Sequence, residues 1–166
     1  MTQTISRPLA LPVSMMGDLR RSEILDGLNA VLANLIDVST AAKEAHWNVR
    51  GPNFAGLHEL FDTIAAETRG FADLVAERLV ALGGKAHGTI QDAVQGSNLS
   101  RFPSDEQQWE VLAAAMRGRL IATSERIRGY ADDLGDEIAT QDIYIEILRE
   151  LEKRAWMLDA HLAGYR

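Results

Sequence analysis

The 166-residue sequence contains no cysteine, and this absence removes several kinds of chemistry from consideration. A chain without cysteine has no disulfide, no thiolate nucleophile and no cysteine-based zinc site. Excess positive charge is also lacking, since the formal net charge is −7, which argues against nucleic-acid binding by default. No apolar run approaches the roughly twenty residues of a membrane span. The apolar fraction of 46% is ordinary for one globular domain with a substantial core.

Proline is scarce, and the stretch from Phe54 to Leu82 has none. Apolar residues recur through that stretch at intervals of three and four, which predicts one long amphipathic helix. The Gly83-Gly84 pair that follows is typical of a helix C-terminus. The apolar positions are Phe54, Leu57, Phe61, Ile64, Phe71, Leu74, Val75 and Leu79.

Three further long helices are expected from the same kind of periodicity. The first spans residues 22–46, and the third starts after a capping box at 104–107 and ends near Gly135. The fourth starts with Thr140 as its N-cap. The connection at 85–103 is long, with a short amphipathic piece at 89–94. Together these features predict an all-α fold, a ferritin-like four-helix bundle with a long cross-connection carrying a short helix. Residues 1–20 are expected to form a flexible tail and residues 21–166 the bundle domain.

Five potential metal ligands lie in one stretch of the chain: His46, His58, Asp62, Asp73 and Glu77. His58 and Asp62 are four residues apart and share a helix face, as do Asp73 and Glu77. The two pairs are fifteen residues apart, so they differ by only about 60° around the axis but by roughly 22 Å along it. Metal–ligand bonds of about 2 Å cannot bridge that distance, so the two pairs cannot form one site within one chain.

A shared site becomes possible if this helix packs antiparallel against a second copy about a two-fold axis. The centre then falls between Glu67 and Thr68, and His58 and Asp62 of one chain face Asp73 and Glu77 of the other, giving two equal sites. His46 joins them if the Gly51-Pro52 turn folds the preceding helix back. Two imidazoles and three carboxylates suit iron, manganese or zinc. The alternative is that these side chains are ordinary solvated surface residues.

The same residues carry a resemblance to a known family. His46–Gly51 reads His-Trp-Asn-Val-x-Gly, Phe54–Asp62 reads Phe-x-x-Leu-His-x-x-Phe-Asp, and Asp73–Arg78 reads Asp-x-x-x-Glu-Arg. These motifs resemble the Dps family, the mini-ferritins named as DNA-binding proteins from starved cells. The match continues through residues 82–84, 88–89 and 102–103 to a final helix with Trp156, and so covers nearly everything from Arg21 onward.

The resemblance implies a ferroxidase centre at the two-fold interface, with all five ligand positions filled. It implies an enzyme that oxidises Fe(II), preferring hydrogen peroxide to O₂ and oxidising two irons per peroxide. It also implies a hollow shell of twelve subunits that stores ferric oxide and protects DNA from oxidative damage. The sequence is consistent with this arrangement, since no predicted helix has the Glu-x-x-His motif of a di-iron site within a single bundle.

Roles are also considered for side chains outside the five candidate ligands. Trp47, beside His46, is interpreted either as an electron donor to reactive oxygen species or as a core residue capping the first helix. The acidic residues Asp132, Asp133, Asp136 and Glu137 are candidates for an iron-entry pore at a three-fold axis. Four arginines are expected in surface ion pairs, and no role is assigned to His87 or His161. The arginines are Arg117, Arg119, Arg126 and Arg128.

Two classes of function remain open. The first is a cytoplasmic, iron-storing ferroxidase that removes peroxide, which the complete ligand set favours. The second is a structural or DNA-compacting shell, associated with the nucleoid, whose metal site is incidental. DNA binding is expected to be weak, because the N-terminal segment offers Arg7, Arg20 and Arg21 but no lysine and the C-terminus ends at Tyr165-Arg166 without a basic extension.

Overall fold

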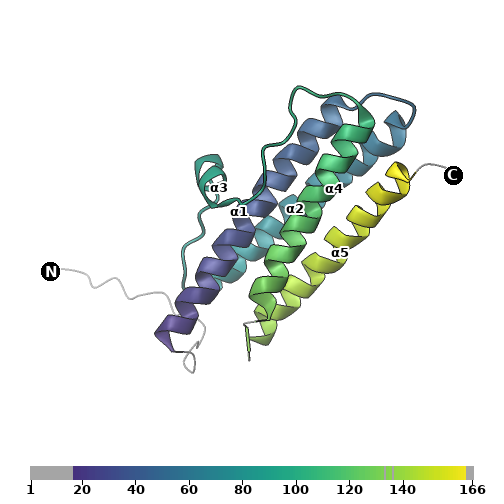
Figure 1. Ribbon diagram of the computed structural model, residues 1–166. Helices are drawn as coiled ribbons and strands as arrows, with labels where there is room; N and C mark the ends of the chain where they lie inside the picture. Colours follow the sequence, from purple (N-terminus) through teal and green to yellow (C-terminus); the bar gives the residue numbers. More distant parts are fainter. Residues whose placement is uncertain (1–16, 133, 136, 164–166) are drawn as a thin grey trace.

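Four long helices run along one another in the computed structural model of the protein (Figure 1). Its helices are α1 (Asp18–Asn48), α2 (Phe54–Ala81), α3 (Ile90–Gly96), α4 (Trp109–Ala131) and α5 (Ile138–Leu162). The structure describes residues 17–132, 134–135 and 137–163, and that part of the chain contains no β-strand. The short α3 lies in the connection between α2 and α4. The all-α bundle with a short helix in its cross-connection is therefore confirmed.

The chain pairs α1 with α2 and α4 with α5, and the connection from residue 82 to 108 runs along the bundle to join the two pairs (Figure 1). Side chains of α1 hold this connection in place. The Asn34 amide donates to Oδ1 of Asn98 at 2.8 Å, and that of Asn29 donates to the Lys85 carbonyl at 3.2 Å. At the far end, the backbone of Arg50 bonds those of Gln107 and Trp109. The connection is thus fixed to the α1–α2 pair at both ends.

The predicted apolar stripe of the first helix lies in the core. Leu28, Val31, Leu35 and Val38 are fully buried. Between Leu19 and Asn48 this helix is long and apolar enough to cross a membrane by length and composition, and it is the one such helix in the described part of the chain. Because its apolar side chains pack inside the bundle, we assign it to the core.

Helix α1 starts at Asp18, four residues before the expected start, and the starts of α4 and α5 also differ from the sequence expectation. Residues 104–107 form no capping box; α4 starts only at Trp109, with Gln108 as an N-cap whose side chain makes no capping bond. The backbone bonds between Arg50 and residues 107 and 109 hold the segment extended there. Helix α5 starts at Ile138, so Thr140 lies inside it and the N-cap is Glu137, whose carboxylate accepts from the Thr140 backbone. A capping box does occur at α3, between Thr89 and Asp92.

The turn between α1 and α2 depends on one glycine. Gly51 has φ +130°, a backbone conformation that side chains with a Cβ rarely adopt. A Cβ at this position would also overlap the Trp109 indole. Gly51 therefore lets α2 turn back along α1 while α4 packs against the turn.

The four arginines of α4 do not all form surface ion pairs. Arg117 pairs with Asp159 and Arg128 with Glu152, as predicted. The prediction is wrong for Arg119, which is 4% exposed and joins Asp37 of α1 to the Ser100 carbonyl. It is also wrong for Arg126, which donates to Asn34 and to the Gly96 carbonyl. Both side chains turn inward because the cross-connection presents carbonyl oxygens that need donors.

Candidate metal centre

His46 and His58 lie face to face where α1 ends and α2 begins. Their ring centroids are 3.7 Å apart and the ring planes are inclined by 21°. His46 is in the last turn of α1 and His58 is in the second turn of α2, so the Gly51 turn brings them together. Phe54 also stacks on His58, with ring centroids 5.0 Å apart. The predicted pairing of these two histidines is thus present within one chain.

Each of these rings is held by the backbone of the other histidine. Nδ1 of His46 lies 2.8 Å from the His58 carbonyl oxygen, and Nδ1 of His58 lies 2.8 Å from the His46 carbonyl oxygen. A carbonyl only accepts, so both Nδ1 atoms carry the proton. In the neutral ring this leaves Nε2 of each histidine with a free lone pair. Metal-binding histidines in proteins commonly have this arrangement, with one nitrogen fixed by a carbonyl and the other on the metal.

Asp62, the third ligand candidate, is ionised and already has a partner. The Lys43 ammonium of α1 hydrogen-bonds its carboxylate and holds the pKa of that carboxyl below its usual value of 3.8. When protonated, His46 and His58 lower the pKa of Asp62 further, to a smaller extent. Both members of the pair remain accessible, with Lys43 40% and Asp62 50% exposed. Lys43 was not identified from the sequence, although it lies one helical turn before His46.

Asp73 and Glu77 lie away from the other three candidate ligands. Both are exposed, and they lie fifteen residues further along the same helix. Within the described residues, no group of three or more His, Asp or Glu side chains is placed to hold a metal ion. The isolated chain therefore presents the candidate ligands as two separate halves, which is the separation that the helix spacing predicts.

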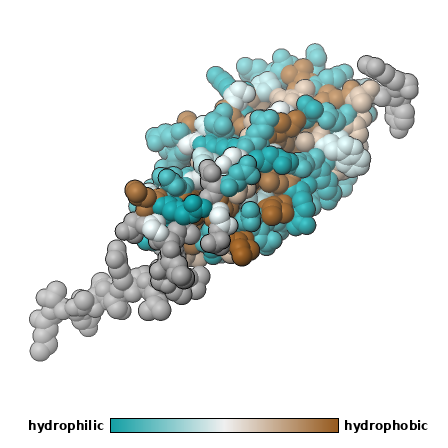
Figure 2. Space-filling model, turned by 60° about the horizontal axis from the view of Figure 1, so that its bottom comes forward, coloured by the Kyte–Doolittle hydropathy of each residue, from teal (hydrophilic) through white to brown (hydrophobic). Residues whose placement is uncertain are grey.

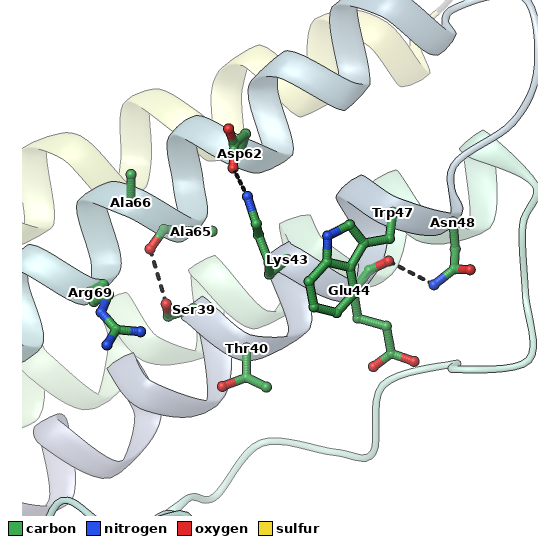
Figure 3. Close-up of a pocket in the computed structure, with 10 residues that line it drawn as sticks. All are labelled: Ser39, Thr40, Lys43, Glu44, Trp47, Asn48, Asp62, Ala65, Ala66 and Arg69. Carbon is green, nitrogen blue, oxygen red and sulfur yellow. Dashed lines mark hydrogen bonds and ion pairs between the residues drawn. The ribbon is translucent and has the colours of Figure 1, made fainter.

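Two adjoining cavities form a groove along the α1–α2 face. One cavity, of about 620 Å³, contains Asp62 and Lys43, and Trp47 stands at its rim (Figure 3). A second, of about 880 Å³, contains Asp73. Arg69 of α2 lines both cavities. The interpretation of Trp47 as a core residue is wrong, because its side chain is 68% exposed at the end of α1.

Part of the candidate pore can be compared with the structure. Glu137 is not free to line a pore within this chain, because it pairs with Arg78 of α2 and caps α5. Asp132 is exposed at the end of α4. Asp133 and Asp136 lie outside the described residues, as do residues 1–16 and 164–166 of the two tails.

Several large apolar side chains remain exposed on the single chain. Figure 2 shows separate apolar areas among polar ones on one face of the molecule. Ile90 and Val94 of α3 are 71% and 76% exposed, and Trp156 of α5 is 67% exposed. Neighbouring exposed side chains such as Ile90 and Val94 differ in this from apolar side chains exposed singly, which are common on protein surfaces.

Comparison with known proteins identifies the family. The model of the ferritin-like domain family matches residues 25–166. A DNA protection during starvation protein of Agrobacterium fabrum is 35% identical over 144 residues, which are 86% of this chain and 89% of that protein. The solved structure of Mycobacterium smegmatis Dps in a tetragonal form has a TM-score of 0.86 at 32% identity and covers 93% of this chain and 96% of that one.

A second solved structure agrees with these matches. Dps from Microbacterium arborescens, solved in its high iron form, has a TM-score of 0.82 at 32% identity and covers 89% of this chain and 97% of that one. The matches extend over nearly the whole length of each relative, and the resemblance found in the sequence motifs is confirmed. The chain therefore belongs to the Dps family of ferritin-like proteins.

Proposed function

We propose that this protein is a ferroxidase that oxidises Fe(II) with hydrogen peroxide and stores the ferric product. The observation that carries the proposal is the reciprocal bonding of His46 and His58, which leaves Nε2 of both rings free in one small region. Asp62, one helical turn beyond His58, adds a carboxylate to the same helix face. These three side chains form half of a mixed nitrogen and oxygen site suited to iron.

The second half comes from another copy of the chain. When two α2 helices pack antiparallel about a two-fold axis between Glu67 and Thr68, Asp73 and Glu77 of one chain lie at the level of Asp62 and His58 of the other. The α2 face between the halves carries Ala66 and Gly70, both exposed. Small side chains at these positions allow two helices to approach closely.

In this arrangement iron is the substrate. Carboxylates interact more strongly with Fe(III) than with Fe(II) because of the higher charge, so three carboxylates favour oxidation. One hydrogen peroxide takes one electron from each of two Fe(II) ions and, with two protons, becomes two water molecules. No hydroxyl radical is released in that balance. O₂ serves as the less efficient oxidant, and Trp47, exposed beside the site, supplies an electron to any reactive oxygen species that forms.

The ferric product is stored inside a hollow shell of twelve subunits in the cytoplasm. The helices from α1 to α5 form the subunit body. The shell protects DNA by removing iron and peroxide, and it binds DNA weakly because each subunit has a formal charge of −7. The name of the Agrobacterium fabrum relative, a DNA protection during starvation protein, supports the protective role.

The competing function is a structural or DNA-binding stress shell with an incidental metal site. The two are separated by loading the metal-free protein with Fe(II) under anaerobic conditions and adding peroxide, beside a His58→Ala, Asp73→Ala variant. Rapid oxidation in the parent protein that is lost in the variant, with the oligomer intact, supports the ferroxidase. Equal rates in both proteins would favour the structural shell.

A further inference from the structure

Arg69 lies on the same α2 face as the candidate ligands, and the described part of the chain gives it no carboxylate partner. It is exposed, and the described residues offer it neither a hydrogen bond nor an ion pair. By contrast, Arg78 of the same helix and Arg154 of α5 each pair with a glutamate inside the bundle. Figure 3 shows Arg69 at the end of the groove away from Trp47. A cation on this face is thus available to a group outside its own chain.

The position of Arg69 along α2 places it between the two ligand halves. It follows Asp62 by seven residues and precedes Asp73 by four, which is roughly 10 Å and 6 Å along the axis. Its direction around the helix is within about 40° of both carboxylates. Arg69 accordingly lines the cavity that contains Asp62 and the cavity that contains Asp73.

The two-fold packing gives Arg69 a defined environment. Residues 66 and 69 are equally distant from the axis between Glu67 and Thr68, so Arg69 of one chain faces the partner subunit's Ala66. The alanine leaves room for a guanidinium. Asp73 of the same chain and the partner subunit's Asp62 then lie at one level, about 6 Å further along the axis. An extended arginine side chain spans that distance.

We propose that Arg69 is a positioning cation that occupies the ligand carboxylates of the shared site before metal arrives and is displaced when Fe(II) binds. The inference rests on the proposed function and deepens it. Each shared site collects three carboxylates, from Asp62 of one chain and from Asp73 and Glu77 of the other. Lys43 compensates the first, and Arg69 compensates Asp73 of its own chain at the point where the partner subunit's Asp62 comes close to it. Arg69 therefore stabilises the metal-free interface and limits the affinity of the site for divalent cations.

Removing the charge has two expected effects of opposite sign. In Arg69→Met the metal-free oligomer dissociates at lower denaturant concentration, because the carboxylates repel one another without a counter-charge. The same variant binds divalent metal about tenfold more tightly, because a dication no longer meets a positive charge roughly 6 Å away. Arg69→Lys keeps the charge and behaves like the parent protein in both respects.

The experiment titrates the full-length, metal-free protein anaerobically with Co(II), follows the visible absorption of the bound ion, and measures subunit dissociation by sedimentation. Arg149→Met is the matched control, since Arg149 is exposed on α5 and lines neither cavity. Tighter Co(II) binding and easier dissociation in Arg69→Met alone support the inference. Unchanged or weaker Co(II) binding in Arg69→Met would overturn it.

A second comparison separates this inference from the proposed function. If the parent protein and the His58→Ala, Asp73→Ala variant bind Co(II) equally, the shared site itself is wrong and the role of Arg69 falls with it. If that variant loses Co(II) binding while Arg69→Met matches the parent protein, the site stands and only the role of Arg69 is wrong.

Discussion

His46 and His58 fix each other's orientation, since Nδ1 of each ring lies 2.8 Å from the backbone carbonyl oxygen of the other. A carbonyl in the last turn of α1 and one in the second turn of α2 serve as the two acceptors. Each histidine is therefore both a candidate ligand and the support for its partner. Losing one ring removes the stacking partner of the other but leaves its carbonyl acceptor in place.

This mutual support predicts a coupled effect on metal binding. His46→Ala should weaken Co(II) binding by more than the loss of one ligand, because the His58 ring loses its stacking partner as well. His46→Gln and His58→Gln, combined in a double-mutant cycle, measure the coupling by Co(II) titration. Additive losses from the two single variants would show that the rings act independently.

Lys43→Met should raise the pKa of Asp62 toward its usual value of 3.8, because the hydrogen bond from the ammonium is the main cause of the low pKa. A lowered pKa in the folded state means that the pair contributes to stability above about pH 4 and that this contribution is lost as the pH falls through the folded-state pKa. Carboxyl-carbon NMR titration of the metal-free protein measures the shift. An unchanged Asp62 midpoint in the variant would contradict the pairing.

Gly51→Ala should destabilise the fold by about 2–3 kcal/mol, because alanine is strained at φ +130° and its Cβ meets the Trp109 ring. Denaturant unfolding monitored by circular dichroism measures the loss. Gly118→Ala is the matched control, since nothing lies within 4 Å of its added Cβ on the exposed side of α4. That control should gain about 0.5–1 kcal/mol, as expected for alanine in a helix. Equal stability of both variants would argue against the tight turn.

Arg119→Met should loosen the cross-connection, because Arg119 joins Asp37 to the Ser100 carbonyl. Without it the Ser100 carbonyl loses this donor, and Asp37 keeps only the bond from the Ser97 hydroxyl. Arg119 is buried but the Asp37 side chain is 32% exposed, so losing this half-buried pair costs about 1–3 kcal/mol. Hydrogen exchange should rise in residues 97–102 before the rest of the chain. The exposed Arg128→Met variant, which breaks the pair with Glu152, should change stability by less than about 1 kcal/mol.

The helices were predictable because their apolar periodicity is local and strong. The contact between His46 and His58 was also predictable, because a single glycine turn joins the two helices that carry them. Fifteen residues of helix between Asp62 and Glu77 also sufficed to predict two separate halves. In each case the sequence distance sets the spatial distance directly.

The errors arose where distant segments override a local pattern. Residues 104–107 read as a capping box, but backbone bonds to Arg50 delay the start of α4. Arg119 looks like a surface residue on α4, and only the path of the cross-connection buries it. The Lys43–Asp62 pair likewise depends on how α1 packs on α2. Apolar periodicity alone does not predict those contacts.

The central claim is that each site takes ligands from two chains, and mixing two inactive variants tests it most directly. His58→Ala and Asp73→Ala chains, each lacking one half of the site, are dissociated, mixed in equal amounts and reassembled. If the halves come from different chains, a mixed pair contains one intact site, and Fe(II) oxidation by peroxide should recover to roughly a quarter of the parent activity. Activity that stays at the level of the unmixed variants, with mixed oligomers present, would contradict the shared site.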